Sequence, residues 1–317
     1  MASFMEMLKA RWAEGKFLCV GLDSDPMQIP EHIAVPDVGE SILAFNLGIT
    51  SKTQDLVCAF KPNLAFYLEY GRAGLEALKE TIAMIHRGSP SVPVILDGKF
   101  GDIGNTSQAY ASFAFDEMQA DAVTVNPYLG QQAIQPFIDR ADKGVIAICK
   151  TSNDGSGEFQ DRLLPQAVIR DEMSRDDFFG IEDFIERDLR ELAIPNYLYV
   201  AYRIAKYWNA EHGNCGVVAG ATYPEELGQV REFVRNLPIL IPGIGKQGGA
   251  LEATVNNGVD GNGQGMIINS SRGIIFASKG EDFAEAARRE AQKFSEAIYM
   301  QLRKKSCRLP EGQASPL

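Results

Sequence analysis

Histidine and cysteine are scarce in this sequence, and neither is arranged as in a metal or disulfide site. The three histidines, His32, His86 and His212, share no ligand-like spacing, so we do not expect a metal site built from histidine. The five cysteines form no CxxC pair, and four of them fall in apolar runs, as buried reduced thiols do. Both shortages argue against a zinc site and against a disulfide-stapled fold.

The sequence also lacks a long apolar run and an excess of positive charge. No stretch approaches the length of a membrane span, and the net charge is −11, with Lys and Arg scattered along the chain. We therefore expect neither a nucleic-acid partner nor an anionic membrane surface. The N-terminal residues Met1–Gly15 carry Glu6 and Glu14 and resemble an amphipathic helix, not a signal peptide, so we expect a cytoplasmic enzyme.

Eight short apolar runs alternate with longer segments of helical periodicity. With 317 residues, of which 45% are hydrophobic, this pattern predicts a single (β/α)₈ barrel domain over residues 1–305. The predicted strands are Phe17–Leu22, Leu56–Phe60, Val92–Leu96, Ala122–Asn126, Val145–Cys149, Gly216–Ala219, Ile239–Ile241 and Met266–Ile268. The main predicted helices are Gly39–Gln54, Gly71–His86, Ser107–Gln119, Gln131–Ala141 and Glu281–Leu302.

The chain is longer than a minimal barrel, and most of the surplus lies between the fifth and sixth predicted strands. The span Asp154–Asn214 is too long for a bare loop, and it contains helix-like pieces at Ile181–Leu192 and Leu198–Glu211. We interpret it as an elaborated crossover within the domain. Residues 306–317 are polar, contain two prolines and are predicted to form a disordered tail.

Charged residues follow the third predicted strand directly. Asp97 and Lys99 would share one face if the strand persisted that far, and Gly101 and Gly104 then open a loop that carries Asp102. Charged groups at the end of a buried strand are costly to place. An Asp–Lys pair that caps a strand is the structural alternative, but similar polar endings recur on other strands.

The first two predicted strands end in charged residues as well. Asp23 follows strand one and is placed to accept hydrogen bonds from hydroxyls, although a turn or helix-capping aspartate explains it equally well. Lys61 follows strand two and precedes a proline. A lysine that extends toward solvent is the alternative. We favour a functional lysine, because barrel geometry aims it at the strand that ends in Asp97 and Lys99.

The later strand ends combine small, polar and glycine residues. The loop after strand five carries Ser152 and can present polar groups to a flat ring, although plain turn chemistry fits equally. Glycine-rich turns follow strands seven and eight, the usual place of a phosphate in such barrels, and Arg272 adds a bidentate donor. The alternative is tight turns with Arg272 in a surface ion pair.

Together these residues resemble the orotidine 5'-phosphate decarboxylase family, in its longer bacterial branch. The resemblance runs from about Phe17 to Ala277 and rests on Asp97-x-Lys99-x-x-Asp102-Ile103 with Lys61 on the preceding strand. The segments 60–63, 220–225, 242–249 and 270–273 agree in order and spacing. The Asp-x-Lys-x-x-Asp motif alone is less specific, since barrel decarboxylases acting on keto-sugar phosphates share it.

The resemblance implies decarboxylation of orotidine 5'-monophosphate to uridine 5'-monophosphate (UMP) by a homodimer without metal or cofactor. Lys99 would donate the proton to C6 of the pyrimidine, with Asp97 beside the departing carboxylate. Asp102 would reach the neighbouring subunit's site, with Ile103 and Thr106 alongside. The remaining implied roles are the ribose for Lys61 and Asp23, the pyrimidine edge for Ser152, and the phosphate for Gln247 and Arg272. Ser271 is also expected to bind the substrate.

Two alternatives stay open from the sequence. One is a metal-dependent decarboxylase or aldolase acting on keto-sugar phosphates, which a chelator would inactivate. The other is a non-catalytic barrel that binds a nucleotide and regulates a partner. An intact set of lysines and aspartates argues against the second, because binding alone does not need it.

Overall fold

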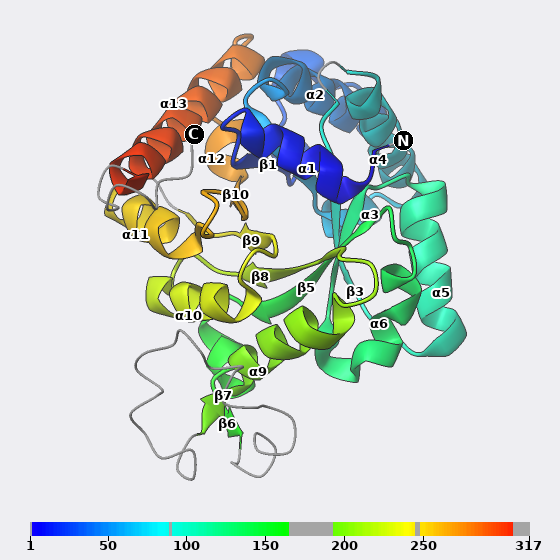
Figure 1. The fold of residues 1–317 in the computed structure, drawn as a ribbon. Helices are drawn as coiled ribbons and strands as arrows, with labels where there is room; N and C mark the ends of the chain where they lie inside the picture. The colour runs from blue at the N-terminus through cyan, green and yellow to red at the C-terminus, as the bar shows by residue number, and fades with distance from the viewer. Residues whose placement is uncertain (1, 89–90, 165–192, 245–247, 307–317) are drawn as a thin grey trace.

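Eight parallel strands form one sheet that closes on itself as a barrel (Figure 1). The computed structural model describes residues 2–88, 91–164, 193–244 and 248–306. Neighbouring strands follow the order β2-β1-β10-β9-β8-β5-β4-β3, and parallel bridges at Phe60–Val94 and Asn63–Asp97 join β2 to β3. The strands are β1 Leu18–Leu22, β2 Val57–Pro62, β3 Ile95–Phe100, β4 Ala122–Val125, β5 Gly144–Lys150, β8 Cys215–Ala219, β9 Ile239–Ile241 and β10 Met266–Ser270. The predicted (β/α)₈ barrel is confirmed.

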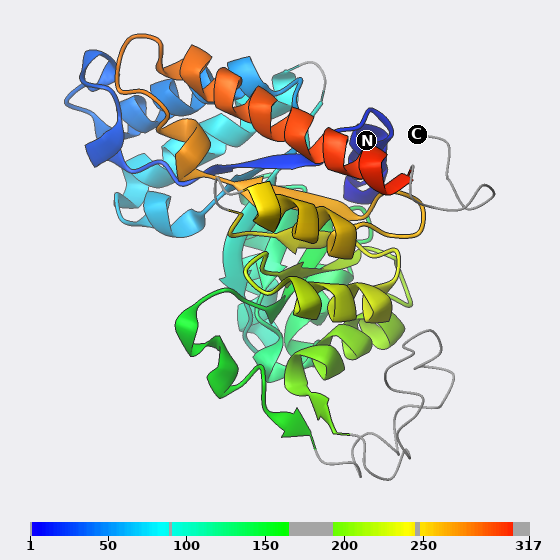
Figure 2. The ribbon, with the colours of Figure 1, turned by 90° about the vertical axis from the view of Figure 1, so that its left-hand side faces the viewer.

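Helices surround the barrel between successive strands (Figures 1 and 2). Every residue of β1, β2 and β4 is buried, because helices cover the outside of the barrel while side chains fill its interior. The helices that follow the strands are α2 Val38–Thr53, α3 Leu64–Leu68, α4 Gly71–Arg87, α5 Gly104–Ser112, α6 Gln131–Ile138, α9 Asn196–Arg203, α10 Pro224–Val234, α11 Gly248–Gly258, α12 Arg272–Ile275 and α13 Phe283–Ser306.

The first helix, α1 (Phe4–Ala13), closes the amino-terminal end of the barrel. A capping box of Ser3 and Glu6 starts it. Its buried face meets the beginnings of three strands: Phe4 lies against Gly144, Arg11 donates to the Val57 carbonyl at 2.8 Å, and Trp12 donates to the Met266 carbonyl at 2.7 Å. With that end closed, the opposite, carboxyl-terminal end is the mouth of the barrel.

The crossover between β5 and β8 is elaborated, as expected. It contains a short antiparallel hairpin of β6 (Leu163–Leu164) and β7 (Ile194–Pro195), which lies apart from the barrel in Figure 2. Helix α9 then continues as a π-helix over Ile204–Trp208, so the helix expected at Leu198–Glu211 is present but two residues earlier at its start and shorter at its end. The helix-like piece at residues 181–192 lies outside the described residues.

Several predicted boundaries were wrong. The helix expected over Ser107–Gln119 is α5 followed by a π-helix over Phe113–Glu117, and α13 runs through Ser306, one residue into the predicted tail. The rest of that tail lies outside the described residues. Strand β3 begins three residues later than predicted and continues to Phe100. No helix among the described residues has the length and apolar character needed to cross a membrane.

Candidate active site

Asp97 joins two lysines at the mouth of the barrel. Its Oδ2 accepts a hydrogen bond from Lys61 Nζ at 2.8 Å, and its Oδ1 accepts one from Lys99 Nζ at 2.7 Å. Lys61 lies near the end of β2, and Asp97 and Lys99 lie in β3. The two strands are neighbours, so these side chains meet at the same rim. We call Lys61, Asp97 and Lys99 the charged array.

Burial and charge oppose each other inside the array. Burial would lower the pKa of Lys61, but the carboxylates of Asp97 and Asp23 outweigh it, and the pKa is raised. Burial would likewise raise the pKa of Asp97, but Lys61 and Lys99 hold it well below its usual range. Both groups therefore carry their charge at neutral pH. Lys99 differs from the other two members of the array, because its side chain is 51% exposed.

The backbone at Lys99 departs from a regular strand. Its φ is +49°, which a residue with a side chain rarely adopts, and the pairing with β4 shifts register between Leu96 and Phe100. The hydroxyl of Thr124 on β4 holds this bulge, accepting from Lys99 N at 3.0 Å and donating to Asp97 Oδ1 at 2.7 Å. Sequence reasoning missed Thr124, although a buried hydroxyl in an otherwise apolar strand was a usable signal.

The loop after β3 carries Asp102 away from the array in this chain. Within the described residues, no hydrogen bond or ion pair joins Asp102 to Lys61, Asp97 or Lys99; its Oδ1 accepts from the Ile103 backbone at 2.7 Å. Ile103 is 68% exposed and Thr106 is exposed too. The structure therefore leaves Ile103 and Thr106 exposed beside the mouth, and Asp102 half-buried there.

A pocket of about 300 Å³ lies between the ends of β1, β9 and β10. Asp23 and Asn269 both line it. The Oδ1 atom of each is buried and has no hydrogen-bond partner among the described residues. Ser271 and Arg272 line the pocket too, and no ion pair engages Arg272 within the described part of the chain. Buried oxygens without donors are costly, so this pocket is built to receive hydrogen-bond donors.

The ends of β5, β8 and β9 meet around Ser152. A side chain at Gly243, whose φ is +91°, would lie 3.4 Å from Ser152 Oγ and 3.7 Å from Thr222 Oγ1. Gly220 allows an equally close approach to the Ser152 backbone. Two hydroxyls therefore gather at the mouth, of which the sequence interpretation singled out Ser152 but not Thr222.

A buried lysine holds the segment after β5 in place. Lys150 forms an ion pair with Asp161, and its ammonium lies 4.9 Å from the ring centre of Tyr223 and 5.4 Å from that of Tyr197. The side chain of Gln160 accepts a hydrogen bond from the Thr151 backbone N–H and donates one to Thr151 Oγ1, both at 2.9 Å. These contacts fix the loop that presents Ser152.

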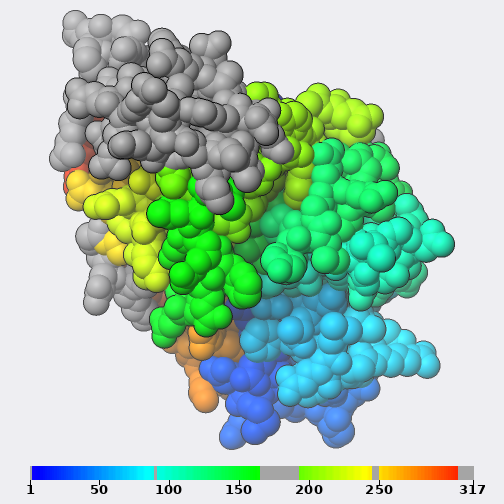
Figure 3. All heavy atoms as spheres, turned by 90° about the horizontal axis from the view of Figure 1, so that it is seen from below, coloured from blue at the N-terminus to red at the C-terminus, as the bar shows by residue number. Residues whose placement is uncertain are grey.

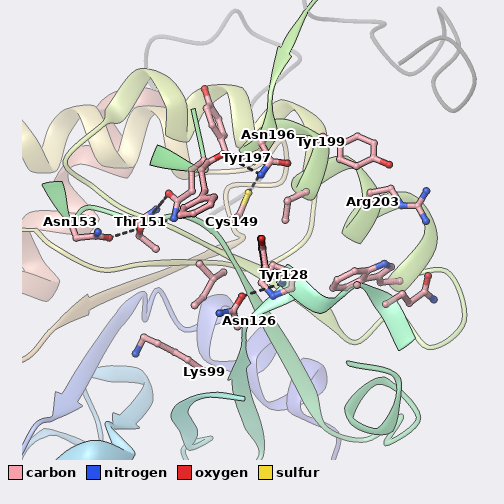
Figure 4. Close-up of a pocket in the computed structure, with 18 residues that line it drawn as sticks. Lys99, Asn126, Tyr128, Cys149, Thr151, Asn153, Asn196, Tyr197, Tyr199 and Arg203 are labelled. Carbon is pink, nitrogen blue, oxygen red and sulfur yellow. Dashed lines mark hydrogen bonds between the residues drawn. The ribbon is translucent and has the colours of Figure 1, made fainter. Parts of the chain in front are cut away.

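A cavity of about 1000 Å³ extends from Lys99 to the crossover. Figure 4 shows Lys99 on one side of it, Asn126 and Tyr128 between, and Asn196, Tyr197 and Arg203 on the far side. In Figure 3 the surface is hollowed where the green segment after β5 faces the teal segments after β3 and β4. The 51% exposed Lys99 therefore borders a space large enough for a small-molecule ligand.

Two further expectations concern residues away from these contacts. Gln247 lies outside the described residues. Among the described residues, Asp139, Glu211 and His212 bring potential metal ligands within reach of one another, but they sit in the turns before β5 and β8, at the end opposite the mouth.

Comparisons with known proteins point to one family. A family model described as orotidine 5'-phosphate decarboxylase / HUMPS family matches residues 16–180. The chain is 45% identical to orotidine 5'-phosphate decarboxylase of Ralstonia pickettii over 289 residues, 91% of this chain and 95% of the relative. The corresponding protein of Cellvibrio japonicus is 41% identical over 93% of this chain and 98% of its own. The solved structure of Leishmania donovani OMP decarboxylase superposes with a TM-score of 0.72 at 33% identity, covering 94% of this chain and 99% of that one.

Proposed function

This chain belongs to the orotidine 5'-phosphate decarboxylase family, and we propose that the charged array is its catalytic centre. The enzyme decarboxylates orotidine 5'-monophosphate to UMP, a step of pyrimidine nucleotide biosynthesis. The observation that carries the assignment of the centre is the Asp97 carboxylate held between two lysine ammonium groups, one of which borders the large cavity.

The reaction requires positive charge at one carbon atom. When the C6–carboxylate bond breaks, carbon dioxide leaves and the electron pair remains on C6, which has no neighbouring carbonyl group to delocalise it. The ammonium of Lys99 stabilises that pair electrostatically and then transfers a proton to it, and the resulting neutral amine regains a proton from solvent. Lys99 is suited to this because its partner Asp97 keeps it in place while its side chain remains half exposed.

Asp97 and Lys61 act by position and charge in this proposal. Asp97 lies beside the departing carboxylate and orients Lys99, and the like-charge contact with the substrate disappears as carbon dioxide leaves. We assign more of the catalysis to carbanion stabilisation than to this ground-state effect. Lys61 neutralises the buried Asp97 and reaches the ribose.

The smaller pocket receives the sugar and phosphate in our proposal. The buried, unpartnered Oδ1 of Asp23 is a ready acceptor for ribose hydroxyls. Ser271 and Arg272 bind the phosphate, supported by a guanidinium without an ion pair among the described residues. Glu290, also at this pocket, pairs with Lys293 at 2.7 Å, which offsets its charge. Gln247 is proposed to join the phosphate from the loop after β9, and Ser152 with Thr222 to bind the pyrimidine edge.

We further propose a homodimer in which Asp102 completes the neighbouring site. Among the described residues no hydrogen bond or ion pair joins Asp102 to the array of its own chain. The loops after β3 and β4 also carry exposed apolar side chains: Ile103 is 68%, Tyr128 78% and Leu129 52% exposed. In a mixture of Asp102→Ala and Lys99→Ala protomers, some mixed dimers would hold one intact site. Activity should therefore reappear on mixing, and its failure to do so after demonstrated subunit exchange would contradict the shared site.

The closing test of the function is an assay of purified protein with orotidine 5'-monophosphate in the presence of EDTA. We expect decarboxylation to continue undiminished, because side chains alone are proposed to carry the chemistry. Inactivation by the chelator would favour a metal-dependent reaction, and tight UMP binding without turnover would favour a regulatory barrel.

We place the enzyme in the cytoplasm, in keeping with the free, buried thiols of Cys19, Cys58, Cys149 and Cys215.

A further inference from the structure

We propose that Asn46 and Tyr67 are positioning residues that aim Asp23 into the sugar pocket. The inference rests on the proposed role of Asp23 in binding ribose. It assigns a function to a buried polar cluster that lies behind the mouth, between β1 and helices α2, α3 and α4. None of its side chains touches the pocket, so they can act only through the backbone that carries Asp23.

The cluster is centred on the side-chain amide of Asn46. Its Oδ1 accepts from Ser24 Oγ at 2.6 Å, and its Nδ2 donates to Tyr67 Oη and to Thr81 Oγ1, both at 3.0 Å. Thr81 in turn donates to the Ala77 carbonyl at 2.7 Å. These four side chains are fully buried, and the amide of Asn46 has a partner for each of its polar atoms.

Both chain neighbours of Asp23 are tied to this cluster. Tyr67 donates its hydroxyl hydrogen to the Leu22 carbonyl at 3.1 Å, and Ser24 is bound to Asn46 directly. The backbone of Asp23 is thus held from both sides, while its own Oδ1 is buried and has no hydrogen-bond partner among the residues that the structure describes. Because no hydrogen bond of the protein holds Asp23 Oδ1, its direction must be fixed through the backbone. The hydrogen bonds on Leu22 and Ser24 do this.

Three helices converge on this one point. Asn46 comes from α2, Tyr67 from α3 and Thr81 from α4. A cluster of buried hydroxyls and an amide has a defined geometry, whereas an apolar cluster of equal volume would leave the rotation of the Asp23 peptide free. The cluster therefore fixes the direction of the Asp23 carboxylate, which apolar packing alone would not do.

The principal test is Tyr67→Phe, which removes one hydroxyl and leaves the ring in place. We expect the Kd for UMP, measured by titration calorimetry, to rise about three- to tenfold, the factor expected for one lost hydrogen bond. The KM for orotidine 5'-monophosphate should rise by a similar factor, with a smaller change in kcat. An unchanged Kd, in an enzyme in which Asp23→Asn does weaken UMP binding, would overturn the inference and leave the role of Asp23 intact.

A double-mutant cycle separates positioning from general destabilisation. In an Asp23→Asn background the substituted side chain no longer supplies the carboxylate to be aimed, so Tyr67→Phe should have little further effect on the Kd for UMP. A full additional loss in that background would mean that Tyr67 acts elsewhere, and would overturn the inference. If Asp23→Asn leaves the Kd unchanged, both the proposed role of Asp23 and the inference fail.

Asn214 provides a matched control for Asn46. It is also a buried asparagine, and its Nδ2 donates to the carbonyls of Ile138, Arg140 and Lys143 at the closed end of the barrel. We expect Asn46→Ala and Asn214→Ala both to lower the melting temperature, but only Asn46→Ala to weaken UMP binding. An equal effect of the two substitutions on UMP binding would contradict a positioning role for Asn46.

Discussion

The two sides of the barrel mouth differ in how far the protein satisfies its own polar groups. On the side of β2 and β3, the charged array is complete, because Asp97 accepts hydrogen bonds from Lys61, Lys99 and the hydroxyl of Thr124. On the side of β1 and β10, Asp23 Oδ1 and Asn269 Oδ1 are buried and have no hydrogen-bond partner in the described part of the chain. One side is organised before any ligand arrives, and the other is left for a ligand to complete.

The difference matches the two tasks that we propose for these residues. Electrostatic stabilisation of a carbanion is most effective when the charges are fixed in advance, because no reorganisation is then needed during the reaction. Binding of sugar and phosphate instead gains from polar groups that have no competing partner in the free protein. Substitutions on the first side should therefore affect turnover and folding, and those on the second should affect affinity.

The largest effect is expected from Lys99→Ala. This change removes both the fixed positive charge and the proposed proton donor, so kcat should fall by at least about 10⁴-fold. The Kd for UMP should change far less, because the smaller pocket is intact. Steady-state and single-turnover assays measure the first quantity, and titration calorimetry the second.

Lys52→Ala is a suitable control for Lys99→Ala. Lys52 forms a surface ion pair with Glu285 at 2.9 Å and lies on α2, away from the mouth. It should leave turnover unchanged. Near-wild-type decarboxylation by the Lys99 variant would rule out the proposed catalytic role.

Arg272→Ala should act on the opposite side and chiefly on affinity. Loss of a charged hydrogen-bond donor is worth about 1.5–3 kcal/mol, so the Kd for UMP should rise by roughly 10- to 100-fold. Folding stability should stay constant, since no ion pair engages Arg272 among the described residues. An unchanged Kd would mean that the phosphate binds elsewhere.

Lys61→Met tests whether the array is also a structural element. Removing one partner of a buried pair leaves Asp97 undercompensated, and the free energy of unfolding should fall by about 3 kcal/mol. Lys52→Met, in an ion pair whose side chains are 46% and 50% exposed, should cost less than about 1 kcal/mol. Denaturant unfolding measures the free energy of unfolding of both variants. Equal losses of stability would contradict a structural role for the array.

The sequence was sufficient for the barrel and for the meeting of Lys61 with Asp97. Eight apolar runs marked the strands, and parallel strands must bring their carboxyl ends to one rim. The prediction of the array therefore needed only the strand order. The roles assigned to these residues stay predictions until the variants are measured.

Other features depend on contacts that no local pattern records. The positive φ of Lys99 arises where β3 meets the hydroxyl of Thr124, and strand periodicity contains no sign of that bulge. The tethers on Ser24 and Leu22 join residues that are 22 and 45 positions apart in the sequence. The proposed role of Asp102 depends on a second chain, which one sequence cannot place.

The smallest expected effect concerns unfolding in acid, and it again compares a buried carboxylate, Asp97, with an exposed one, Asp116. The pKa of Asp97 is lowered in the folded protein, so its stabilisation is present above about pH 4 and is lost as the pH falls further. Asp97→Asn should therefore flatten the dependence of unfolding free energy on pH between about 5 and 3, by at most about 1.4 kcal/mol per pH unit. Asp116→Asn, whose carboxylate pairs with Arg140 at the surface, should flatten it less, because solvent screens that pair. Guanidinium titrations at several pH values measure both slopes, and a wild-type slope for Asp97→Asn would show that the array contributes nothing to acid stability.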